Sequence, residues 1–133
     1  LTKGIPLKTE ADIVLLDPPC TGTGTLMKNP SMKWGLSPSL IKKLQNIQFK
    51  MLENCGKLVK VNGTLIYSTC SITLEENEFL IEKFLKLNPN FKLVSIEPSI
   101  GLSGFRGQIL CKRLYPHIHE SEGFFIAKMK REF

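Results

Sequence analysis

The feature that most constrains the fold of this chain is an alternation between short apolar runs and amphipathic helical segments. Four runs have the pattern of buried strands, and they cover residues 12–16, 64–70, 91–96 and 123–130. Helical segments separate the first three runs, which predicts an α/β layer fold with a mostly parallel sheet. A Gly-rich loop over 97–122 separates the last two runs, and its length is typical of functional loops.

Local signals predict where the two helices begin. Ser37 is expected to cap the first helix with Pro38 at its first position, since serine accepts a hydrogen bond from a free backbone N–H and proline lacks one. In the register of this helix, Cys55 belongs to the buried face. Asn62-Gly63 is expected to turn the chain into the second strand. The capping-box pattern T-L-E-E at 73–76 predicts the start of the second helix.

Charge and cysteine usage narrow the classes of function. The 133 residues carry a net charge of +6, which permits an anionic partner such as RNA without proving one. No two of the four cysteines are spaced as zinc ligands, and His117 and His119 have no cysteine near them, so no metal site is expected. The sequence shows neither a secretory signal nor an apolar span of about 18 residues. The thiols are therefore expected to stay reduced in the cytoplasm, with no membrane partner.

Two short motifs place a cysteine at the end of a predicted strand. D-P-P-C-T-G-T-G covers 17–24 and contains Cys20, and Y-S-T-C-S covers 67–71 and contains Cys70. In open α/β sheets, ligands bind beyond the carboxyl ends of the strands. If the first two strands are neighbours, about 5 Å apart, both thiols face one cleft. We therefore expect Cys20 and Cys70 to share a site.

The residues of these motifs also have plainer interpretations. The predicted helix start after Cys70 favours a thiolate there, yet a strand cysteine is often only a core residue. Asp17 is either a functional carboxylate or a loop cap. Gly22 and Gly24 indicate a close approach of the backbone to a ligand, although G-x-G alone is a weak signal. A Cys20–Cys70 disulfide suits the geometry but not a reducing compartment.

Together with further motifs, these residues resemble the Nop/Sun (Fmu-like) family of S-adenosylmethionine-dependent RNA cytosine-5 methyltransferases, in the C-terminal half of the catalytic domain. The motifs that carry the resemblance are D-P-P-C-T-G-T-G at 17–24, K-N-P-S-M-K-W at 28–34, L-V-K-V-N-G-T-L-I-Y-S-T-C-S-I at 58–72, E-E-N-E at 75–78, R-L-Y-P-H at 113–117 and G-F-F-I-A at 123–127. Their order and spacing fit the family over almost all of the chain.

The resemblance implies methylation of carbon 5 of cytosine in rRNA or tRNA through a covalent cysteine–cytosine intermediate. In the family pattern Cys70 is the nucleophile that adds to carbon 6, and Cys20 assists release of the methylated product. Asp17 contacts the cytosine edge and the neighbourhood of the S-adenosylmethionine cofactor. The residues that resemble the RNA side of the family are Lys28, Lys33 and Trp34. Lysines suit phosphates and an indole suits base stacking, whereas the plainer interpretation is a solvated basic loop with one packed tryptophan.

The resemblance also implies a fold, namely the C-terminal half of a doubly wound Rossmann-like class I methyltransferase sheet with three parallel strands and an antiparallel last strand. The family's cofactor loop and its acidic ribose ligand should lie upstream, and the chain begins at Leu1 rather than at a methionine. We therefore expect residues 1–133 to form a partial catalytic domain of a longer protein, inactive on its own. Its first strand would be an exposed apolar edge, covered by the missing half or by self-association.

Three other functions compete with this one. A DNA cytosine-5 methyltransferase would use the Pro19-Cys20 thiol as nucleophile, but the Thr69-Cys70 motif and R-L-Y-P-H argue against it. An amino-group methyltransferase would carry an aromatic residue where Cys20 stands. A non-catalytic RNA-binding fragment would keep the basic surface but transfer no methyl group without the cofactor loop. That last function stays the alternative.

Overall fold

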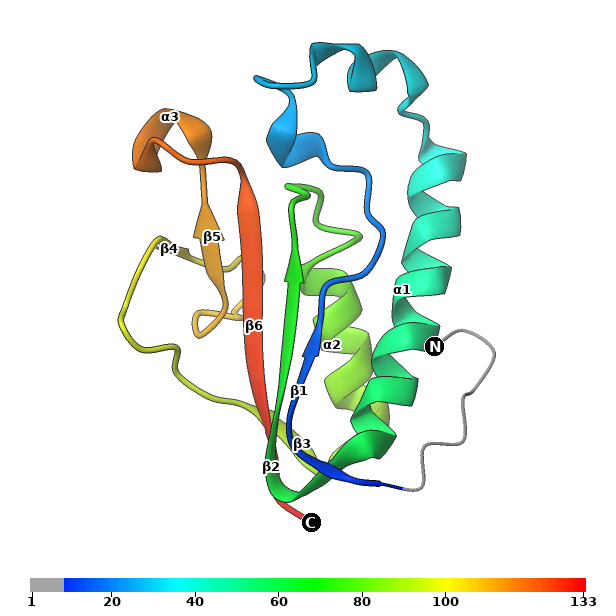
Figure 1. The fold of residues 1–133 in the computed structure, drawn as a ribbon, viewed down its shortest axis with the longest axis vertical. Helices are drawn as coiled ribbons and strands as arrows, with labels where there is room; N and C mark the ends of the chain where they lie inside the picture. The colour runs from blue at the N-terminus through cyan, green and yellow to red at the C-terminus, as the bar shows by residue number, and fades with distance from the viewer. Residues whose placement is uncertain (1–8) are drawn as a thin grey trace.

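A six-stranded mixed sheet organises residues 9–133, which are the residues that the computed structural model describes (Figure 1). The strands are, in chain order, β1 (Ala11–Leu16), β2 (Val59–Thr69), β3 (Phe91–Leu93), β4 (Leu102–Ser103), β5 (Lys112–Leu114) and β6 (Phe124–Arg131). Across the sheet their order is β1-β2-β6-β5-β4, and β3 pairs with β6 off this path. The chain therefore adopts the α/β fold with one sheet that the alternating sequence pattern predicts.

The strand directions agree with the predicted half of a methyltransferase sheet. β1 and β2 pair in parallel, while β6 runs antiparallel to both β2 and β3. The first three strands therefore run in one direction and the last long strand runs against them. The expected loop over 97–122 instead contains β4, β5 and the short helix α3 (Pro116–His119), which is a correction. These elements are too short to produce a periodic pattern in the sequence.

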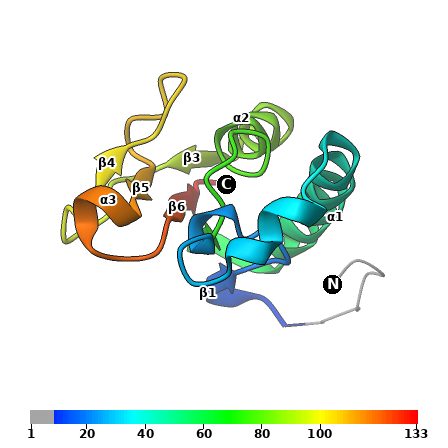
Figure 2. The same ribbon diagram turned by 90° about the horizontal axis from the view of Figure 1, so that it is seen from above.

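Two long helices cover the same face of the sheet (Figure 2). α1 (Pro38–Leu58) begins as predicted, with the Ser37 Oγ accepting a hydrogen bond from the Leu40 N–H at 3.2 Å. α2 (Glu78–Leu87) begins later than the capping-box pattern predicts, and this prediction was wrong. The reason lies in the turn before it, where the carboxylate of Glu76 is bound to other loops rather than to a helix end.

The core lies between these helices and alternate residues of the two central strands. The apolar strand residues with no exposed surface are Val59, Leu65 and Tyr67 on β2, and Phe125, Ala127 and Met129 on β6. Cys55 on α1 is buried in this core, as predicted, and so is Cys111. Burial raises the pKa of the Cys111 thiol to about 12 and also raises that of Cys55. Both thiols are therefore protonated core groups.

Asn62-Gly63 does not turn the chain between two elements, which corrects the prediction. β2 runs without a break from Val59 to Thr69, and its register to β1 shifts after the Ala11–Val59 pair. Asn62 has a φ of 67°, so the turn residues form a bulge inside the strand. The third strand is also shorter than the predicted 91–96.

β1 stands at the end of the strand order, so its free edge is exposed as the sequence predicts. On its face away from α1, Ile13 and Leu15 are each 67% exposed. The opposite face packs inward through Leu16. No helix within the described residues has the length and apolar character needed to cross a membrane.

Candidate active site

Two thiols meet where the parallel strands β1 and β2 end. Cys70 directly follows the last residue of β2, and Cys20 follows β1 after Pro18-Pro19. The Sγ atoms lie 3.3 Å apart, and both thiols are free and partly exposed. Because β1 and β2 run in parallel, their carboxyl ends lie at one edge of the sheet, where ligands bind in such folds. The prediction that the two cysteines lie together is confirmed.

The surroundings of the Cys20 thiol favour its protonated form. Burial, followed by the hydrogen bond and the charge of Cys70, raises the pKa of Cys20 to about 12. Cys20 therefore keeps its proton at neutral pH and can donate it to the Cys70 sulfur. The predicted help from a helix N-terminus beside Cys70 is wrong, since α2 begins only at Glu78.

A buried carboxylate connects the two cysteine loops. Glu76 is fully buried in the turn between β2 and α2, and it accepts hydrogen bonds from four uncharged residues. These are Thr21 (N–H and Oγ1, both 2.8 Å), Gln48 (3.1 Å), Thr73 (2.5 Å) and Ser71. Burial alone would raise the pKa of Glu76, but the bonds from Ser71, Thr73 and Thr21 outweigh it and lower the pKa. Glu76 is therefore a carboxylate at neutral pH.

Gly24 brings a third segment against the cysteine loops. Its N–H donates to the Cys70 carbonyl at 2.9 Å, and its carbonyl accepts from the Gly123 N–H at 2.8 Å. A Cβ on Gly24 would lie 2.3 Å from the Gly123 oxygen, so no other residue fits without a backbone shift. The sequence suggested that glycine here lets a ligand approach, whereas the group that approaches is Gly123, directly before β6. Gly22 has a φ of 68°, which glycine adopts readily.

A buried ion pair fixes the segment after Cys70. Arg113 on β5 donates to both carboxylate oxygens of Glu78 on α2, each at 2.5 Å. Its remaining Nη1 donates to the Ile72 carbonyl at 3.0 Å. Sequence reasoning gave Glu76 only a place in the expected capping box and assigned no role to Glu78 or Arg113. The available signal was their place in the E-E-N-E and R-L-Y-P-H motifs.

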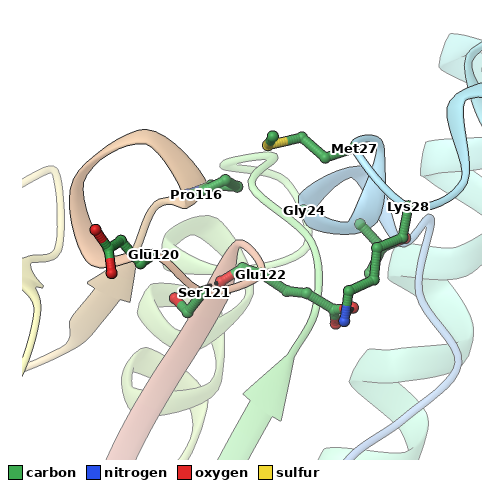
Figure 3. A pocket seen from close by; sticks show the side chains of 8 residues that line it. Gly24, Met27, Lys28, Pro116, Glu120, Ser121 and Glu122 are labelled. Carbon is green, nitrogen blue, oxygen red and sulfur yellow. Dashed lines mark hydrogen bonds and ion pairs between the residues drawn. The ribbon is translucent and has the colours of Figure 1, made fainter.

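A cavity of about 440 Å³ lies between the loop of Gly24 and the segment that precedes β6 (Figure 3). Its lining residues are Gly24, Thr25, Met27 and Lys28 on one side, and Pro116, Glu120, Ser121 and Glu122 on the other. Lys28 and Glu122 approach each other across it, with 2.9 Å between Nζ and Oε1. Since Gly24 also bonds to Cys70, one wall of the cavity is continuous with the cysteine loop.

The remaining predicted site residues are all exposed. Asp17 directly follows β1, at the same end of the sheet as the thiols. Lys33 and Trp34 lie on the short 3-10 helix η2 (Pro30–Gly35), with the Lys33 Nζ 4.9 Å from the centre of the indole ring. Trp34 is 81% exposed, so the interpretation of a packed tryptophan is wrong.

At the edge where ligands bind in such sheets, the described residues include an exposed carboxylate but no group of metal ligands. At the carboxyl end of β1, Asp17 is an exposed carboxylate that fits a cationic or hydroxyl-bearing ligand. Within residues 9–133, no three histidine, cysteine or acidic side chains are grouped so as to hold a metal ion. His119 instead accepts a hydrogen bond from the Tyr115 N–H through Nδ1 at 2.9 Å.

The comparison with known protein families shows to which family the chain belongs. A family model described as 16S rRNA methyltransferase RsmB/F matches residues 2–130. The chain belongs to this family. The RsmB/F assignment confirms the resemblance to Nop/Sun methyltransferases that the motifs carry.

Several relatives of this RsmB/F chain are named as ribosomal RNA methyltransferases. It is 40% identical to a 25S rRNA (cytosine-C(5))-methyltransferase, nop2, of Schizosaccharomyces pombe, over 90% of this chain and 22% of the relative. It is 38% identical to a probable ribosomal RNA small subunit methyltransferase B of Synechocystis, over 90% of this chain and 27% of the relative. The chain thus spans about a quarter of the length of these two curated relatives.

Solved structures show the same fold. NSun6 from Pyrococcus horikoshii, crystallised with SFG, has a TM-score of 0.88 and 32% identity, over 99% of this chain and 33% of that chain. A methyltransferase homolog protein from the same organism has a TM-score of 0.78 and 35% identity, over 93% of this chain and 40% of that one. Both similarities place the RsmB/F chain within the fold of these methyltransferases.

Proposed function

We propose that these residues form part of an S-adenosylmethionine-dependent enzyme that methylates carbon 5 of cytosine in RNA, either rRNA or tRNA. The observation that supports this most directly is the 3.3 Å separation of the Cys20 and Cys70 sulfurs at the ends of two parallel strands. Relatives named rRNA cytosine-C5-methyltransferases support the same reaction. Thiols that are kept reduced suit a cytoplasmic enzyme.

Cys70 is proposed as the nucleophile. Carbon 5 of cytosine is a poor nucleophile until a thiolate adds to carbon 6. In this step the Cys70 thiol gives up its proton to solvent and its sulfur forms a bond to carbon 6. The electron pair of the 5,6 double bond shifts to the 4,5 position and charge passes to N3, which makes carbon 5 nucleophilic. When bound, S-adenosylmethionine supplies the methyl group. Cys70 is the better placed of the two thiols because Cys20 retains its proton and can donate it to the Cys70 sulfur.

Cys20 is proposed to act in the release step. The proton on carbon 5 passes to solvent, its bonding electrons restore the 5,6 double bond, and the bond between sulfur and carbon 6 breaks. The departing Cys70 sulfur then carries a negative charge. Since Cys20 remains a thiol 3.3 Å away, its S–H can stabilise that charge. Separate groups thus serve attack and release.

The RNA is proposed to approach across the surface formed by the 440 Å³ cavity and η2. Lys28 borders the cavity, and Lys33 and Trp34 are exposed on η2. Lysines neutralise phosphates and an exposed indole stacks on an unpaired base. The target cytosine must leave its stack to reach a thiol, which costs least in single-stranded or looped RNA.

Asp17 is proposed to border both the cytosine and the cofactor. Its exposed carboxylate directly follows β1, at the edge where the thiols lie. It provides only one wall, so we expect the isolated 133-residue chain to act as a partial catalytic domain and to bind S-adenosylmethionine weakly. Micromolar affinity of this chain in calorimetry would contradict that expectation.

The exposed edge of β1 is proposed to pair with a further strand in the full-length protein. Ile13 and Leu15 are exposed on the same strand, and open apolar edges favour association. The isolated chain is therefore expected to self-associate in sedimentation experiments. A monodisperse monomer would count against this proposal.

The proposed function is tested with the full-length protein, S-adenosylmethionine and deproteinised cellular RNA. Methylated cytosine is measured by mass spectrometry of nucleosides. The proposal expects 5-methylcytosine with the wild type and none with Cys70→Ala. RNA binding without methylation by the wild type would instead favour the non-catalytic alternative.

A further inference from the structure

We propose that Glu76 is a positioning residue for the thiol pair, because its buried carboxylate ties the loop of Cys20 to the loop of Cys70 and thereby sets the separation of the two sulfurs. The catalytic consequence of this inference rests on the proposed function. The claim that Glu76 sets the separation of the two sulfurs rests only on its hydrogen bonds. Glu76 does not touch either sulfur and acts only through the neighbours of the two cysteines.

On the Cys20 side, the contacts hold both neighbours of the cysteine. The Thr21 N–H donates to the Glu76 Oε1 at 2.8 Å, so the backbone directly after Cys20 is fixed. Gln48 Nε2 donates both to the same Oε1, at 3.1 Å, and to the Pro19 carbonyl at 2.9 Å. Cys20 is therefore held from the residue before it and the residue after it, and both restraints lead to one carboxylate oxygen.

On the Cys70 side, the contact is made through the next residue. Ser71 is fully buried and donates its hydroxyl proton to the Glu76 Oε2. The Thr21 hydroxyl donates to that same oxygen at 2.8 Å, and its oxygen lies 3.1 Å from the Ser71 Oγ. The residues that follow the two cysteines thus share one acceptor, although they are 50 positions apart in the sequence.

The backbone of Glu76 is also anchored, so its carboxylate projects from a fixed point. The Tyr67 hydroxyl, on β2 inside the core, donates to the Glu76 backbone carbonyl at 2.7 Å. Glu76 is fully buried, and hydrogen bonds to a charged acceptor are stronger than bonds between neutral groups. Movement of either cysteine loop must therefore break charge-assisted bonds.

The separation of the sulfurs matters because both act on one ring. One sulfur forms the bond to carbon 6, and the second must lie close to it when that bond breaks. A misplacement of about 1 Å can cost on the order of a hundredfold in rate. Loss of the Glu76 charge is therefore expected to lower kcat for methylation while leaving RNA affinity nearly unchanged, since Glu76 is buried away from the proposed RNA surface.

The test measures how readily Cys20 and Cys70 form a disulfide in full-length protein equilibrated with reduced and oxidised glutathione. In this reaction the protein S–S bond forms, the glutathione S–S bond breaks, and the two thiol protons pass to two glutathione molecules. Mass spectrometry of alkylated peptides gives the disulfide fraction. The variants are Glu76→Gln and Thr21→Val, and Glu75→Gln is the matched control, because Glu75 is the exposed neighbour of Glu76.

We expect the equilibrium constant for the disulfide to fall at least about tenfold in Glu76→Gln, about threefold in Thr21→Val and less than twofold in Glu75→Gln. In parallel, kcat for methylation should fall at least about tenfold in Glu76→Gln with KM within about threefold. An unchanged disulfide equilibrium in a folded Glu76→Gln protein overturns the inference. If that variant does not fold, an unchanged equilibrium in Thr21→Val overturns it. Absence of methylation by the wild type would refute the proposed function and leave the disulfide result to decide the geometric inference.

Discussion

Arg113 on β5 and Glu78 on α2 form an ion pair with two parallel hydrogen bonds, and both side chains are almost wholly buried. Arg113 is 1% exposed and Glu78 is 0% exposed. The third nitrogen of the guanidinium, Nη1, donates to the carbonyl of Ile72, two residues beyond Cys70. This pair therefore connects the helix layer, the sheet and the segment that carries one of the thiols.

Arg113→Met is expected to destabilise the full-length protein by about 3 to 5 kcal/mol, because it leaves the Glu78 carboxylate buried without its partner. Urea denaturation of the variant and the wild type measures this loss. The control is Arg106→Met, since Arg106 and Glu82 form a half-exposed pair at 3.2 Å that should contribute about 0 to 1 kcal/mol. Equal losses of unfolding free energy in the two variants would contradict the prediction that the buried pair contributes more to stability than the half-exposed one.

Gly24→Ala is expected to destabilise the protein by about 1 to 3 kcal/mol, because the new methyl group would overlap the backbone of Gly123. The control is Gly35→Ala, where a Cβ meets nothing within 4 Å. The measurement is the urea midpoint of each variant. A Gly24→Ala protein as stable as Gly35→Ala would show that the start of β6 can move away at little cost.

The lowered pKa of Glu76 predicts a pH dependence of stability. A carboxylate with a folded pKa below its unfolded value stabilises the protein fully above the unfolded pKa, about 4.3, and loses that contribution as pH falls through the folded pKa. The stability difference between the wild type and Glu76→Gln should therefore be constant near neutrality and shrink in acid. Denaturation series at several pH values measure it, with Glu75→Gln as control. A stability difference between these two proteins that grows as the pH falls would mean that folding raises the pKa of Glu76 rather than lowering it.

Much of the fold could be predicted because its signals are local. Buried strands appear as apolar runs, and the α1 start follows from Ser37 and Pro38. The start of α2 was mispredicted because the T-L-E-E pattern is the same whether Glu76 bonds to a helix end or to a distant loop. Only the tertiary structure shows that its carboxylate binds Thr21, 55 residues away.

The thiol pair could be predicted for a different reason. Motifs that follow two neighbouring parallel strands must meet at one edge of the sheet, so the positions of Cys20 and Cys70 followed from topology. The partners of Gly24 and Arg113 did not follow, because no sequence pattern specifies which strand approaches a loop or which carboxylate a buried arginine meets. The roles of the site residues stay predictions. The next two predictions, on RNA binding and on the two thiols, test them.

Trp34→Ala is expected to weaken binding of single-stranded RNA by about tenfold to a hundredfold, because stacking of one base on an exposed indole contributes about 1 to 3 kcal/mol. Lys33→Ala should also weaken binding and reduce the salt dependence by about 0.7 in the logarithmic slope. The control is Lys92→Ala on β3, which pairs with the end of β6 far from Gly123. Fluorescence anisotropy with full-length protein at several salt concentrations gives the affinities. Equal effects of Lys33→Ala and Lys92→Ala would place RNA elsewhere.

The two thiols are expected to fail at different steps when each is replaced in the full-length protein. Cys70→Ala should abolish methylation and form no covalent RNA adduct, since no sulfur remains to attack carbon 6. Cys20→Ser should still attack and transfer the methyl group and then stall, because the thiol that is proposed to serve the release step is absent. The stalled complex of protein and RNA should survive a denaturing gel run with labelled RNA and S-adenosylmethionine. The core thiol of Cys55 provides a control, as Cys55→Ala should form no excess adduct over the wild type. Adducts with Cys70→Ala but not with Cys20→Ser would reverse the two roles and make Cys20 the nucleophile.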